Sequence, residues 1–468
     1  MLNILHQYVS LRVLVLFVVE GILIAASLFL GARLRFWDSP VKFQLFTTFP
    51  TFGVQVITIM LVCQLCFYFS DLYNLNAVRA PAEQLILIEQ SLGGASLLLA
   101  IVYFLVPSLL VGRGVIFISM VLTGVLVAVT RPAINRAWSV AGVRQRVLIL
   151  GTGELARDLA REIHVRSALG IDVIGFAAED PRDYTGEDLF GRPVLGVVSD
   201  VDSIAKTMAI SRIIVAIEDR REKLPIRELV RLRVRGVRVD DVQTVLTALT
   251  GRVWLRSVKS SWFVFSDGFT ASRITKFAKR VMDILLAAIG FTSSFPIMCL
   301  VALAIRFESK GPVVYRQIRV GRAGRQFEVL KFRSMAIDAE RNGQAMWAAS
   351  NDPRVTRVGT FIRKYRLDEL PQFVNIIRGD MSFVGPRPER PFFVQQLRDC
   401  IPYYDERHSI RPGLTGWAQI RYGYGSNVED AQRKLEYDLF YLKNMSILFD
   451  CVIVFGTIRI VLGGQNSR

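Results

Sequence analysis

Four long apolar runs near the N-terminus constrain the fold of this chain most strongly. They cover roughly residues 13–33, 52–70, 85–107 and 114–130, and each approaches the roughly 20 residues that a helix needs to cross a bilayer. The first run is not a cleaved signal peptide, because little basic sequence precedes it and three similar runs follow it. The sequence therefore predicts a membrane protein in which residues 1–135 form a bundle of four transmembrane helices.

Charge and topology point to a membrane partner and not to nucleic acid. The 468 residues include 58 Lys and Arg against 41 Asp and Glu, a net charge of +17, which alone would suit nucleic acid, anionic lipid or phosphorylated substrates. The apolar runs favour the membrane among these partners.

Basic residues mark the cytoplasmic side of spans, and four follow the last run: Arg131, Arg136, Arg144 and Arg146. The remainder of the chain is therefore expected in the cytoplasm, although the basic first loop runs against this rule.

Two acidic residues lie inside the apolar runs. A charge is costly in the hydrocarbon region of a bilayer, so Glu20 and Glu89 must either face other helices or be protonated. We expect packing or a partner contact for both, and not a proton pathway.

A strand, a glycine turn and a helix are predicted in "RVLILGTGELARDLAREI". Gly151, Gly153 and Ala156 fit the pattern G-x-G-x-x-G/A, whose glycines let the backbone approach a pyrophosphate at a helix N-terminus. The stretches "DVIGFAAED", "RIIVAIED" and "VRVDDVQ" predict further strands. Residues 146–250 are therefore predicted to form a Rossmann-like α/β domain, with Gly151 and Gly153 as its candidate nucleotide contacts.

One fingerprint leaves the ligand of this domain open between a nucleotide and a purely structural or regulatory fold. Four spans followed by such a domain also resemble the membrane-bound nucleotide-sugar dehydratases and epimerases, which are NAD-dependent oxidoreductases. Those enzymes move a proton with a Tyr-x-x-x-Lys pair. Tyr184, the only tyrosine of the domain, has Asp188 at the lysine position, so this rival interpretation lacks its acid and base.

A fifth apolar run, about 283–305, carries Pro296 near its centre. Proline removes a backbone hydrogen bond and clashes with the preceding turn, so we expect a kink there, with Ser293 and Ser294 available to the freed carbonyls. Basic residues occupy both flanks, and a spanning helix would carry one cluster across the membrane. A re-entrant helix is therefore expected, with a kinked fifth span as the alternative.

Two cations and two acids in the last third of the chain suit phosphate chemistry. Lys331 and Arg333 project from one face of a predicted strand. Asp368 and Glu369 stand side by side just before Pro371, which is tolerated in the first turn of a helix, so they should lie at a helix N-terminus where anions are favoured. Mg²⁺ uses one or two carboxylates together with substrate phosphates.

Six ordered motifs follow Arg273: "GPVVYRQIRVG", "KFRSM", "RLDELPQ", "SFVGPRPE", "RPGLTGWAQ" and "YDLFYLKN". They resemble the bacterial sugar transferases, the monotopic polyprenyl-phosphate phosphoglycosyl transferases that begin glycan assembly. Large members of that family also carry four spans and an α/β domain, so the resemblance covers essentially the whole chain. It implies a linker over 251–272 and, over 273–468, an α/β catalytic domain with the re-entrant helix.

The resemblance implies transfer of a sugar 1-phosphate from a UDP-sugar to undecaprenyl phosphate, with release of UMP, as the first membrane step of exopolysaccharide synthesis. The catalytic domain would face the cytoplasm at the bacterial inner membrane. Asp368 would be the nucleophile that carries the phosphosugar, and Glu369 the Mg²⁺ ligand. Four cations are expected at the diphosphate and nucleotide, and one acid in a supporting role: Lys331, Arg333, Arg363, Arg387 and Asp438.

Two further expectations accompany this interpretation. Large family members imply a homodimer through the spans or the α/β domain. A non-enzymatic alternative is an assembly or regulatory membrane protein with a catalytically inactive transferase fold, which the intact motifs disfavour.

Overall fold

The computed structural model of the chain divides into two compact units, Met1–Val242 and Gln243–Arg468, here called the N-terminal and C-terminal units. Each is described by itself. The structure describes residues 2–4, 7–9, 11–70, 72–73, 81–140, 145–166, 171–181, 189–218, 224–258, 263, 268–269, 272–336, 354–423, 425 and 427–462.

Four long apolar helices occupy the first part of the N-terminal unit: α1 (Leu11–Arg35), α3 (Phe52–Phe69), α4 (Pro81–Leu105) and α5 (Arg113–Val140). Each is long and apolar enough to cross a membrane. One buried cluster takes Leu28 from α1, Phe67 from α3, Leu99 from α4 and Val127 from α5, while other large apolar side chains of the same helices face outward. Helices that are apolar all round suit a lipid environment, as predicted for a membrane protein.

The two acids inside these helices differ in their surroundings. Glu20 of α1 accepts a hydrogen bond of 2.6 Å from Nε of Arg131 on α5, and both side chains are buried. A second Arg131 nitrogen donates to the Leu72 carbonyl at 2.9 Å. The expected partner contact of Glu20 is therefore confirmed. Glu89 is exposed on α4 and lies near the start of the apolar stretch, so it does not pack inside the bundle. A contact with a partner stays a prediction for this residue.

The second part of the N-terminal unit is an open parallel sheet in the order β5-β4-β3-β6-β7. Its strands are β3 (Gln145–Leu150), β4 (Ile171–Ala178), β5 (Val194–Val197), β6 (Arg212–Val215) and β7 (Arg238–Asp241), with helices α6 (Glu154–Val165), α7 (Val201–Thr207) and α8 (Ile226–Val234) between them. The predicted α/β region is confirmed, although β5 was not predicted. Leu148, Ile213 and Val215 form part of its core.

The C-terminal unit combines short sheets with many helices. It contains α9 (Val242–Thr250, which begins at the unit boundary), α11 (Arg273–Glu308), the hairpin β8 (Val314–Val320) and β9 (Gln326–Phe332), α12 (Arg357–Lys364), the 3₁₀ turn η7 (Leu367–Glu369), α13 (Gln372–Arg378), β10 (Ser382–Val384), α14 (Pro391–Cys400), η8 (Tyr404–Ser409), β11 (Gly413–Thr415), α15 (Trp417–Arg421), α16 (Val428–Lys443) and α17 (Ile447–Leu462). Strands β10 and β11 pair in parallel.

The first described residues of the expected linker pack within this unit. The Trp417 indole donates to the Gly251 carbonyl at 2.7 Å, and Arg252 forms a buried ion pair with Glu436 of α16 at 2.8 Å. These contacts fix the chain where it enters the C-terminal unit.

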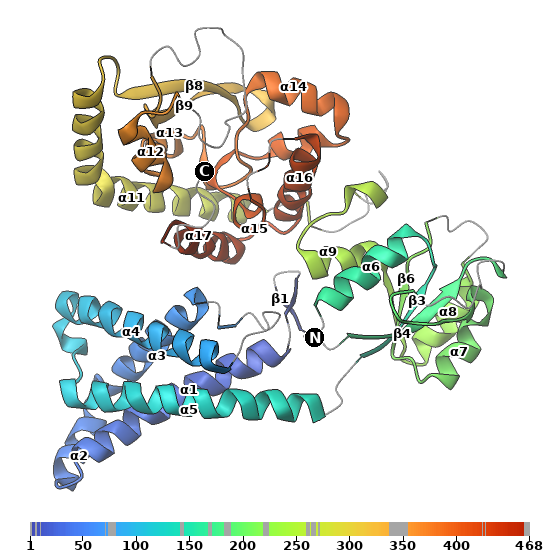
Figure 1. The fold of residues 1–468 in the computed structure, drawn as a ribbon, viewed down its shortest axis with the longest axis horizontal. Coiled ribbons are helices and arrows are strands. Elements are labelled where there is room, and N and C mark those ends of the chain that lie inside the picture. The colour runs from blue at the N-terminus through green and yellow to red at the C-terminus, as the bar shows by residue number, and fades with distance from the viewer. Residues whose placement is uncertain are drawn as a thin grey trace. The chain divides into compact units, whose positions relative to one another are not determined.

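Helix α11 contains Pro296, and Figure 1 shows it as two helical segments that meet at a bend. The expected bend is thus confirmed. The serines play a different part from the one expected: Ser293 and Ser294 both donate to the Gly290 carbonyl, at 3.2 and 2.6 Å, whereas a proline at 296 frees the carbonyl four residues before it.

Both segments of α11 hold the turn that carries Asp368 and Glu369. Ala287 and Phe291, before the proline, pack in one apolar cluster, while Val301 and Ile305, after it, pack in another. Leu370 contacts both clusters. The η7 turn is therefore fixed relative to both segments.

Buried polar contacts secure the first segment of α11. Asp283 accepts from the Ser382 hydroxyl at 2.8 Å and from the Phe383 amide at 2.9 Å. Lys279 donates to Asp450 of α17 at 2.7 Å, and Arg280 donates to the Ile376 carbonyl at the end of α13 at 2.7 Å. These bonds attach α11 to β10, α13 and α17.

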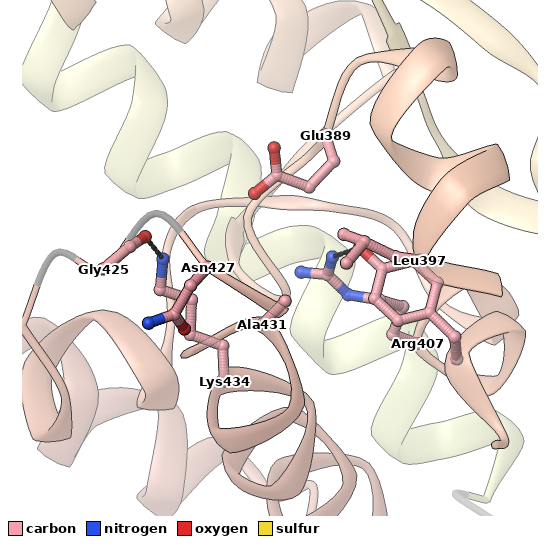
Figure 2. A pocket seen from close by; sticks show the side chains of 8 residues that line it. Glu389, Leu397, Arg407, Gly425, Asn427, Ala431 and Lys434 are labelled. Carbon is pink, nitrogen blue, oxygen red and sulfur yellow. Dashed lines mark hydrogen bonds between the residues drawn. The ribbon is translucent and has the colours of Figure 1, made fainter. Parts of the chain in front are cut away.

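A pocket lies where α14, η8 and α16 approach one another, shown in Figure 2. It is small, with a cavity volume of about 30 Å³, and it is open to solvent. Its lining combines apolar and charged side chains: Glu389, Leu397, Tyr404, Arg407, Gly425, Asn427, Ala431 and Lys434.

The pairing of β10 with β11 gives the first testable prediction. A Cβ on Gly413 would overlap the backbone of Gly385, so Gly413→Ala should destabilise the C-terminal unit by about 1–3 kcal/mol or more. The apparent Tm of the purified protein in detergent should fall by several degrees. Gly94→Ala in α4, where a Cβ meets nothing within 4 Å, is the control and should not lower the Tm. An unchanged Tm for Gly413→Ala would contradict this packing.

Candidate active site

Asp368 and Glu369 lie in η7, immediately before α13, as predicted. Arg366, just before the turn, adopts a left-handed conformation with φ of 54°, which is uncommon outside glycine and is found at functional sites. Near the start of α13, the Phe373 and Val374 amides donate to carbonyls of the preceding turn at 3.2 and 3.1 Å. These two amides are therefore not available to bind an anion. An anion at this site must therefore be held mainly by side chains.

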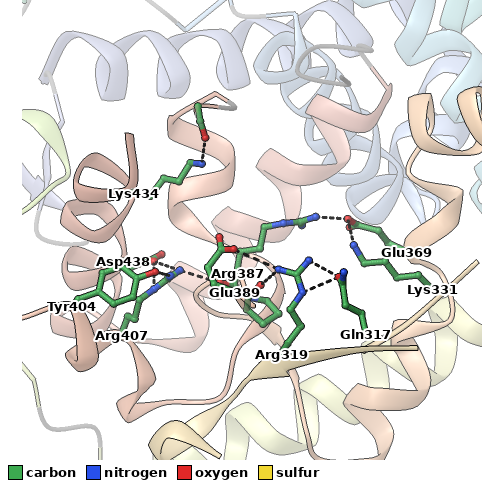
Figure 3. Close-up of polar contacts among 12 residues, drawn as sticks. Gln317, Arg319, Lys331, Glu369, Arg387, Glu389, Tyr404, Arg407, Lys434 and Asp438 are labelled. Atoms are coloured by element: carbon green, nitrogen blue, oxygen red, sulfur yellow. Dashed lines mark hydrogen bonds and ion pairs between the residues drawn. The ribbon is translucent and has the colours of Figure 1, made fainter. Parts of the chain in front are cut away.

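Glu369 is surrounded by positive charge. Arg387 donates to Oε1 at 2.6 Å, Lys331 Nζ lies 4.0 Å from the same oxygen, and Arg366 lies 4.0 Å from Oε2. Figure 3 shows Arg387 and Lys331 reaching this carboxylate from different elements. Burial alone would raise the pKa of Glu369, but Arg387 and Lys331 hold it well below its usual value. Glu369 is therefore permanently ionised at neutral pH.

Asp368 behaves in the opposite way. Burial and the adjacent negative charge of Glu369 raise the pKa of Asp368 to about 6, against the opposing effect of Lys331, Arg387 and Arg363. Its residue surface is only partly buried, and no described residue donates a hydrogen bond to its carboxyl group. Pairs of acids whose environments separate their pKa values carry different chemical roles. The pair therefore combines a strongly stabilised anion, Glu369, with a carboxyl group whose pKa is raised, Asp368.

Lys331 is positioned through a side chain that sequence reasoning missed. The Asn375 amide of α13 donates to the Glu328 carbonyl at 2.7 Å and accepts from the Leu330 amide at 3.0 Å, which ties α13 to β9. Lys331 thereby faces Glu369, and burial lowers the pKa of its ammonium to about 8. Nothing in the sequence around Asn375 signals this pairing.

The other predicted contacts are distributed differently. Arg363 lies in the last turn of α12, and its positive charge favours the ionised form of Asp368 and so lowers the pKa of that residue. Arg333 is not brought to the dyad: its buried guanidinium donates to the carbonyls of Ser309 and Lys310 at 2.9 and 3.1 Å. It closes the C-terminal end of α11 and stabilises the fold there, while its expected diphosphate contact stays a prediction.

Asp438 supports the site indirectly, through a second residue. It is buried on α16 and pairs with Arg407 at 2.9 Å, and Arg407 also donates to the Arg387 carbonyl at 2.9 Å. Burial raises the pKa of Asp438 to about 6 although Arg407 opposes this. Asp438 thus orients Arg387 indirectly, through Arg407.

A second set of contacts joins β8 to the two residues that follow Arg387. Arg319 donates to the Pro388 carbonyl at 3.0 Å and lies 3.4 Å from Glu389, and it also donates to Gln317 at 2.6 Å, as Figure 3 shows. Neither Arg319 nor Arg407 was predicted at the site. Glu389 had a signal in the sequence, because it closes the motif "SFVGPRPE".

The donor set fits Mg²⁺ and not a zinc-type centre. No group of three or more His, Cys, Asp or Glu side chains gathers among the residues the structure describes. Asp368 and Glu369 nevertheless offer adjacent hard oxygen donors. Burial and, second, the charge of Glu369 raise the pKa of Asp368, and a dication would offset the repulsion between the two carboxylates. Mg²⁺ needs only one or two carboxylates when phosphates complete its shell.

The glycine turn of the α/β region has a structural explanation. Gly151 has a φ of +113°, and a Cβ there would lie 2.9 Å from the Ala216 carbonyl, so glycine is required for the close approach of β6. Carboxylates of Glu179 and Glu218 lie near the Cβ positions of Gly151 and Gly153, at 3.4 and 3.8 Å. Nucleotide contacts by the two glycines remain a prediction. Tyr184 and Asp188 lie outside the described residues.

Comparison with known proteins gives two family matches. Residues 274–464 match the family described as "Bacterial sugar transferase", and residues 68–240 match "CoA-binding domain".

Three relatives show how much of this chain and of each relative the matches cover. A UDP-N-acetylgalactosamine-undecaprenyl-phosphate N-acetylgalactosaminephosphotransferase of Aeromonas hydrophila is 44% identical over 52% of this chain and 56% of the relative. A UDP-glucose:undecaprenyl-phosphate glucose-1-phosphate transferase of Klebsiella pneumoniae is 33% identical over 70% of this chain and 71% of the relative. A protein of the same name from Xanthomonas campestris pv. campestris is 27% identical over 99% of this chain and 96% of the relative. The chain thus matches little more than half the length of the Aeromonas protein.

The opposed pKa shifts predict opposite effects of neutralising each acid. The folded state raises the pKa of Asp368 from 3.8 to about 6, so its ionisation opposes folding above that pH. Asp368→Asn should raise the free energy of unfolding by about 1–3 kcal/mol at pH 8. The gain should shrink as the pH falls from about 6 toward 3.8. Glu369→Gln should instead lower the Tm at pH 8, because Arg387 loses its partner. Thermal unfolding at pH 8 and pH 4.5 checks both; a lower Tm for Asp368→Asn at pH 8 would contradict the electrostatic account.

Proposed function

The chain belongs to the bacterial sugar transferase family, and we propose that it transfers a sugar 1-phosphate from a UDP-sugar to undecaprenyl phosphate, releasing UMP. The names of the Aeromonas, Klebsiella and Xanthomonas relatives describe this reaction with N-acetylgalactosamine or glucose. Because these names differ in the sugar, the proposal does not specify one. The family membership also sets aside the rival interpretation as a nucleotide-sugar dehydratase or epimerase.

One observation carries the proposal: two adjacent carboxylates have opposite electrostatic environments within one cation-rich turn. Asp368, with a pKa of about 6, is ionised at neutral pH yet is not held by a strong partner. A carboxylate in this state is a competent nucleophile. Glu369, paired with Arg387, is too strongly stabilised as an anion to attack.

The proposed reaction has two displacements at one phosphorus atom. A carboxylate oxygen of Asp368 attacks the sugar-bearing phosphorus, the bond to the bridging oxygen breaks, and UMP leaves with that oxygen. An acyl phosphate that bears the sugar then joins Asp368 to the substrate. A phosphate oxygen of the polyprenyl carrier attacks the same phosphorus, the bond to Asp368 breaks, and the carboxylate is restored.

The surrounding cations are proposed to hold the diphosphate. Phosphoryl transfer depends mainly on positioning and charge neutralisation, and Lys331, Arg387 and Arg363 supply positive charge around the dyad. When bound, Mg²⁺ would neutralise further phosphate charge. Glu369, whose ionised form Arg387 stabilises, would hold it.

We also propose that α11 enters the inner membrane from the cytoplasmic face and returns to it. The bend in α11 and the basic flanks of its apolar stretch support this arrangement. Because Leu370 packs against both segments of α11, the dyad would then lie at the lipid boundary, within reach of the carrier phosphate. The product would begin an exopolysaccharide or related glycan.

The covalent step predicts an exchange reaction without any lipid acceptor. Purified protein given a UDP-sugar, Mg²⁺ and radiolabelled UMP should move label into the UDP-sugar, because the first displacement is reversible. Asp368→Asn should abolish this exchange, with a loss of at least about a thousandfold expected for a removed nucleophile. Asp405→Asn, in an exposed carboxylate of η8, is the control and should exchange normally. Exchange at the normal rate in Asp368→Asn would exclude this residue as the nucleophile.

Re-entry of α11 predicts where its ends can be labelled. Single cysteines replacing Ser272 and Lys310, at the two ends of the helix, are introduced into a chain without its natural cysteines. A membrane-impermeant maleimide should label both in inside-out vesicles and neither in right-side-out vesicles. Labelling of the two ends from opposite sides would show a fifth span instead.

A further inference from the structure

Helix α8 of the α/β region carries apolar side chains both toward the core and toward solvent. Leu229 and Leu232 are buried in the core beside the sheet. Ile226, Val230 and Val234, at intervals of four residues, are instead 64%, 55% and 83% exposed. Side chains four residues apart lie on one face of a helix, so these three form an exposed apolar stripe. A surface helix normally turns polar residues toward water, and a continuous exposed apolar stripe indicates a contact surface.

Positive charge surrounds this stripe. Glu228 is the only acid of α8, and the nearby Asp202 is already paired with Lys206 and with Arg235. The helix has three exposed arginines, and no carboxylate of the described residues forms an ion pair with them: Arg227, Arg231 and Arg233. The apolar stripe and these three arginines are here called the α8 surface. It combines apolar side chains with positive charge that the described part of the chain does not neutralise.

The edge of the sheet at which α8 ends is also the edge at which the chain enters the sheet. Strands β3, β6 and β7 are parallel, and a helix that joins two parallel strands runs back in the opposite direction. The C-terminal end of α8, with Arg233 and Val234, therefore lies at the edge where the strands begin. Backbone hydrogen bonds join this edge: the Ser211 amide donates to the Arg146 carbonyl at 3.0 Å, and the Arg238 amide donates to the Ser211 carbonyl at 3.1 Å. The exposed Arg146 adds positive charge there.

This edge is tethered to the membrane through α5. The apolar segment of α5 ends at Ile134, the helix ends at Val140, and β3 begins at Gln145. Six helical residues followed by five further residues span at most about 27 Å. The edge of the sheet that carries the end of α8 is therefore held near the membrane surface. Because the tether keeps the local concentration high, even a weak attraction to that surface suffices for docking.

Charge selects among the partners that could cover the stripe. A second copy packed with α8 against α8 would bring two clusters of arginines together, and like charges across an interface are unfavourable. An anionic layer of lipid headgroups attracts the same arginines. Arginine stems can lie along apolar surface while their guanidinium groups reach the phosphates, and apolar side chains of an interfacial helix enter the boundary between headgroups and acyl chains.

We propose that the α8 surface docks the α/β region on the anionic lipids of the membrane that the spans cross. Ile226, Val230 and Val234 enter the headgroup boundary, and Arg231 and Arg233 contact lipid phosphates. This inference does not depend on the transfer of a sugar phosphate, since it concerns a region of the chain that the proposed reaction does not use.

Quenching of a fluorophore by labelled lipids tests this docking in the full chain. Val230→Cys is introduced into a chain without its natural cysteines and labelled with an environment-sensitive fluorophore, in nanodiscs whose lipids carry a nitroxide on the acyl chain. Quenching should be strong when the discs contain phosphatidylglycerol, weak with phosphatidylcholine alone, and should fall as salt is added. Ser199→Cys, exposed directly after β5 at the opposite edge of the sheet, is the control and should not be quenched in either lipid.

Variants of charge test the part played by the arginines. In the chain labelled at position 230, Arg231→Gln with Arg233→Gln should lower the ratio of docked to undocked protein in phosphatidylglycerol discs by about tenfold or more. Arg157→Gln with Arg161→Gln, two exposed arginines of α6, removes the same charge and should leave the ratio unchanged.

Three results would overturn the proposal. The first is quenching at position 230 no stronger than at position 199 in phosphatidylglycerol discs. The second is a fluorophore at position 230 that is shielded from water but not quenched by the lipids, which would assign the stripe to a protein contact such as a second copy. The third is quenching that does not change with lipid charge or with the two arginine substitutions of α8.

Discussion

The packing of the dyad turn against both segments of α11 is the interaction on which the rest of this structure depends. Leu367 and Leu370 flank the two acids, and Leu370 joins the clusters built by the two halves of the helix. Full burial of a leucine side chain contributes about 1.5–3 kcal/mol, and the partly buried Leu370 contributes a share of this in each cluster, which fixes the turn to the apolar helix. The carboxylates are thereby held at a set depth relative to the segment proposed to enter the bilayer. A lipid-linked acceptor and a water-soluble donor can meet only at such a boundary.

The cations around the turn explain how two neighbouring acids persist in a buried site. A paired charge costs little when opposite charges and hydrogen bonds surround it, and Glu369 receives these from Arg387 and Lys331. Asp368 is stabilised less by opposite charges and hydrogen bonds, and so it remains the less stable anion of the two. The two carboxylates are therefore stabilised unequally, and this asymmetry underlies the proposal that Asp368 is the nucleophile and Glu369 the fixed charge. The network through Arg407 and Asp438 keeps Arg387 in place for both.

Features that depend on local sequence were predictable, whereas long-range pairings of side chains were not. The apolar runs, the parallel α/β region, the bend of α11 and the position of the dyad before α13 follow from length, pattern and proline. The pairing of Arg333 with the end of α11 was not predictable, since an alternating strand pattern says which face a cation occupies but not which carbonyls it meets. Gly151 was read as a phosphate contact, yet its close approach to Ala216 already requires glycine. Arg407 lies in no motif with a known spacing, so its link to Asp438 appears only in the fold.

The central claim is that Asp368 becomes covalently loaded with a sugar phosphate, and peptide mass spectrometry tests it most directly. The protein is incubated with a UDP-sugar and Mg²⁺ without polyprenyl phosphate, quenched, digested and analysed for the mass of one sugar phosphate. The account predicts this mass on the peptide that contains Asp368, with fragmentation placing it on that residue, and its disappearance when polyprenyl phosphate is added before the quench. The adduct on a different residue, or UMP release with no adduct on any peptide, would contradict the account.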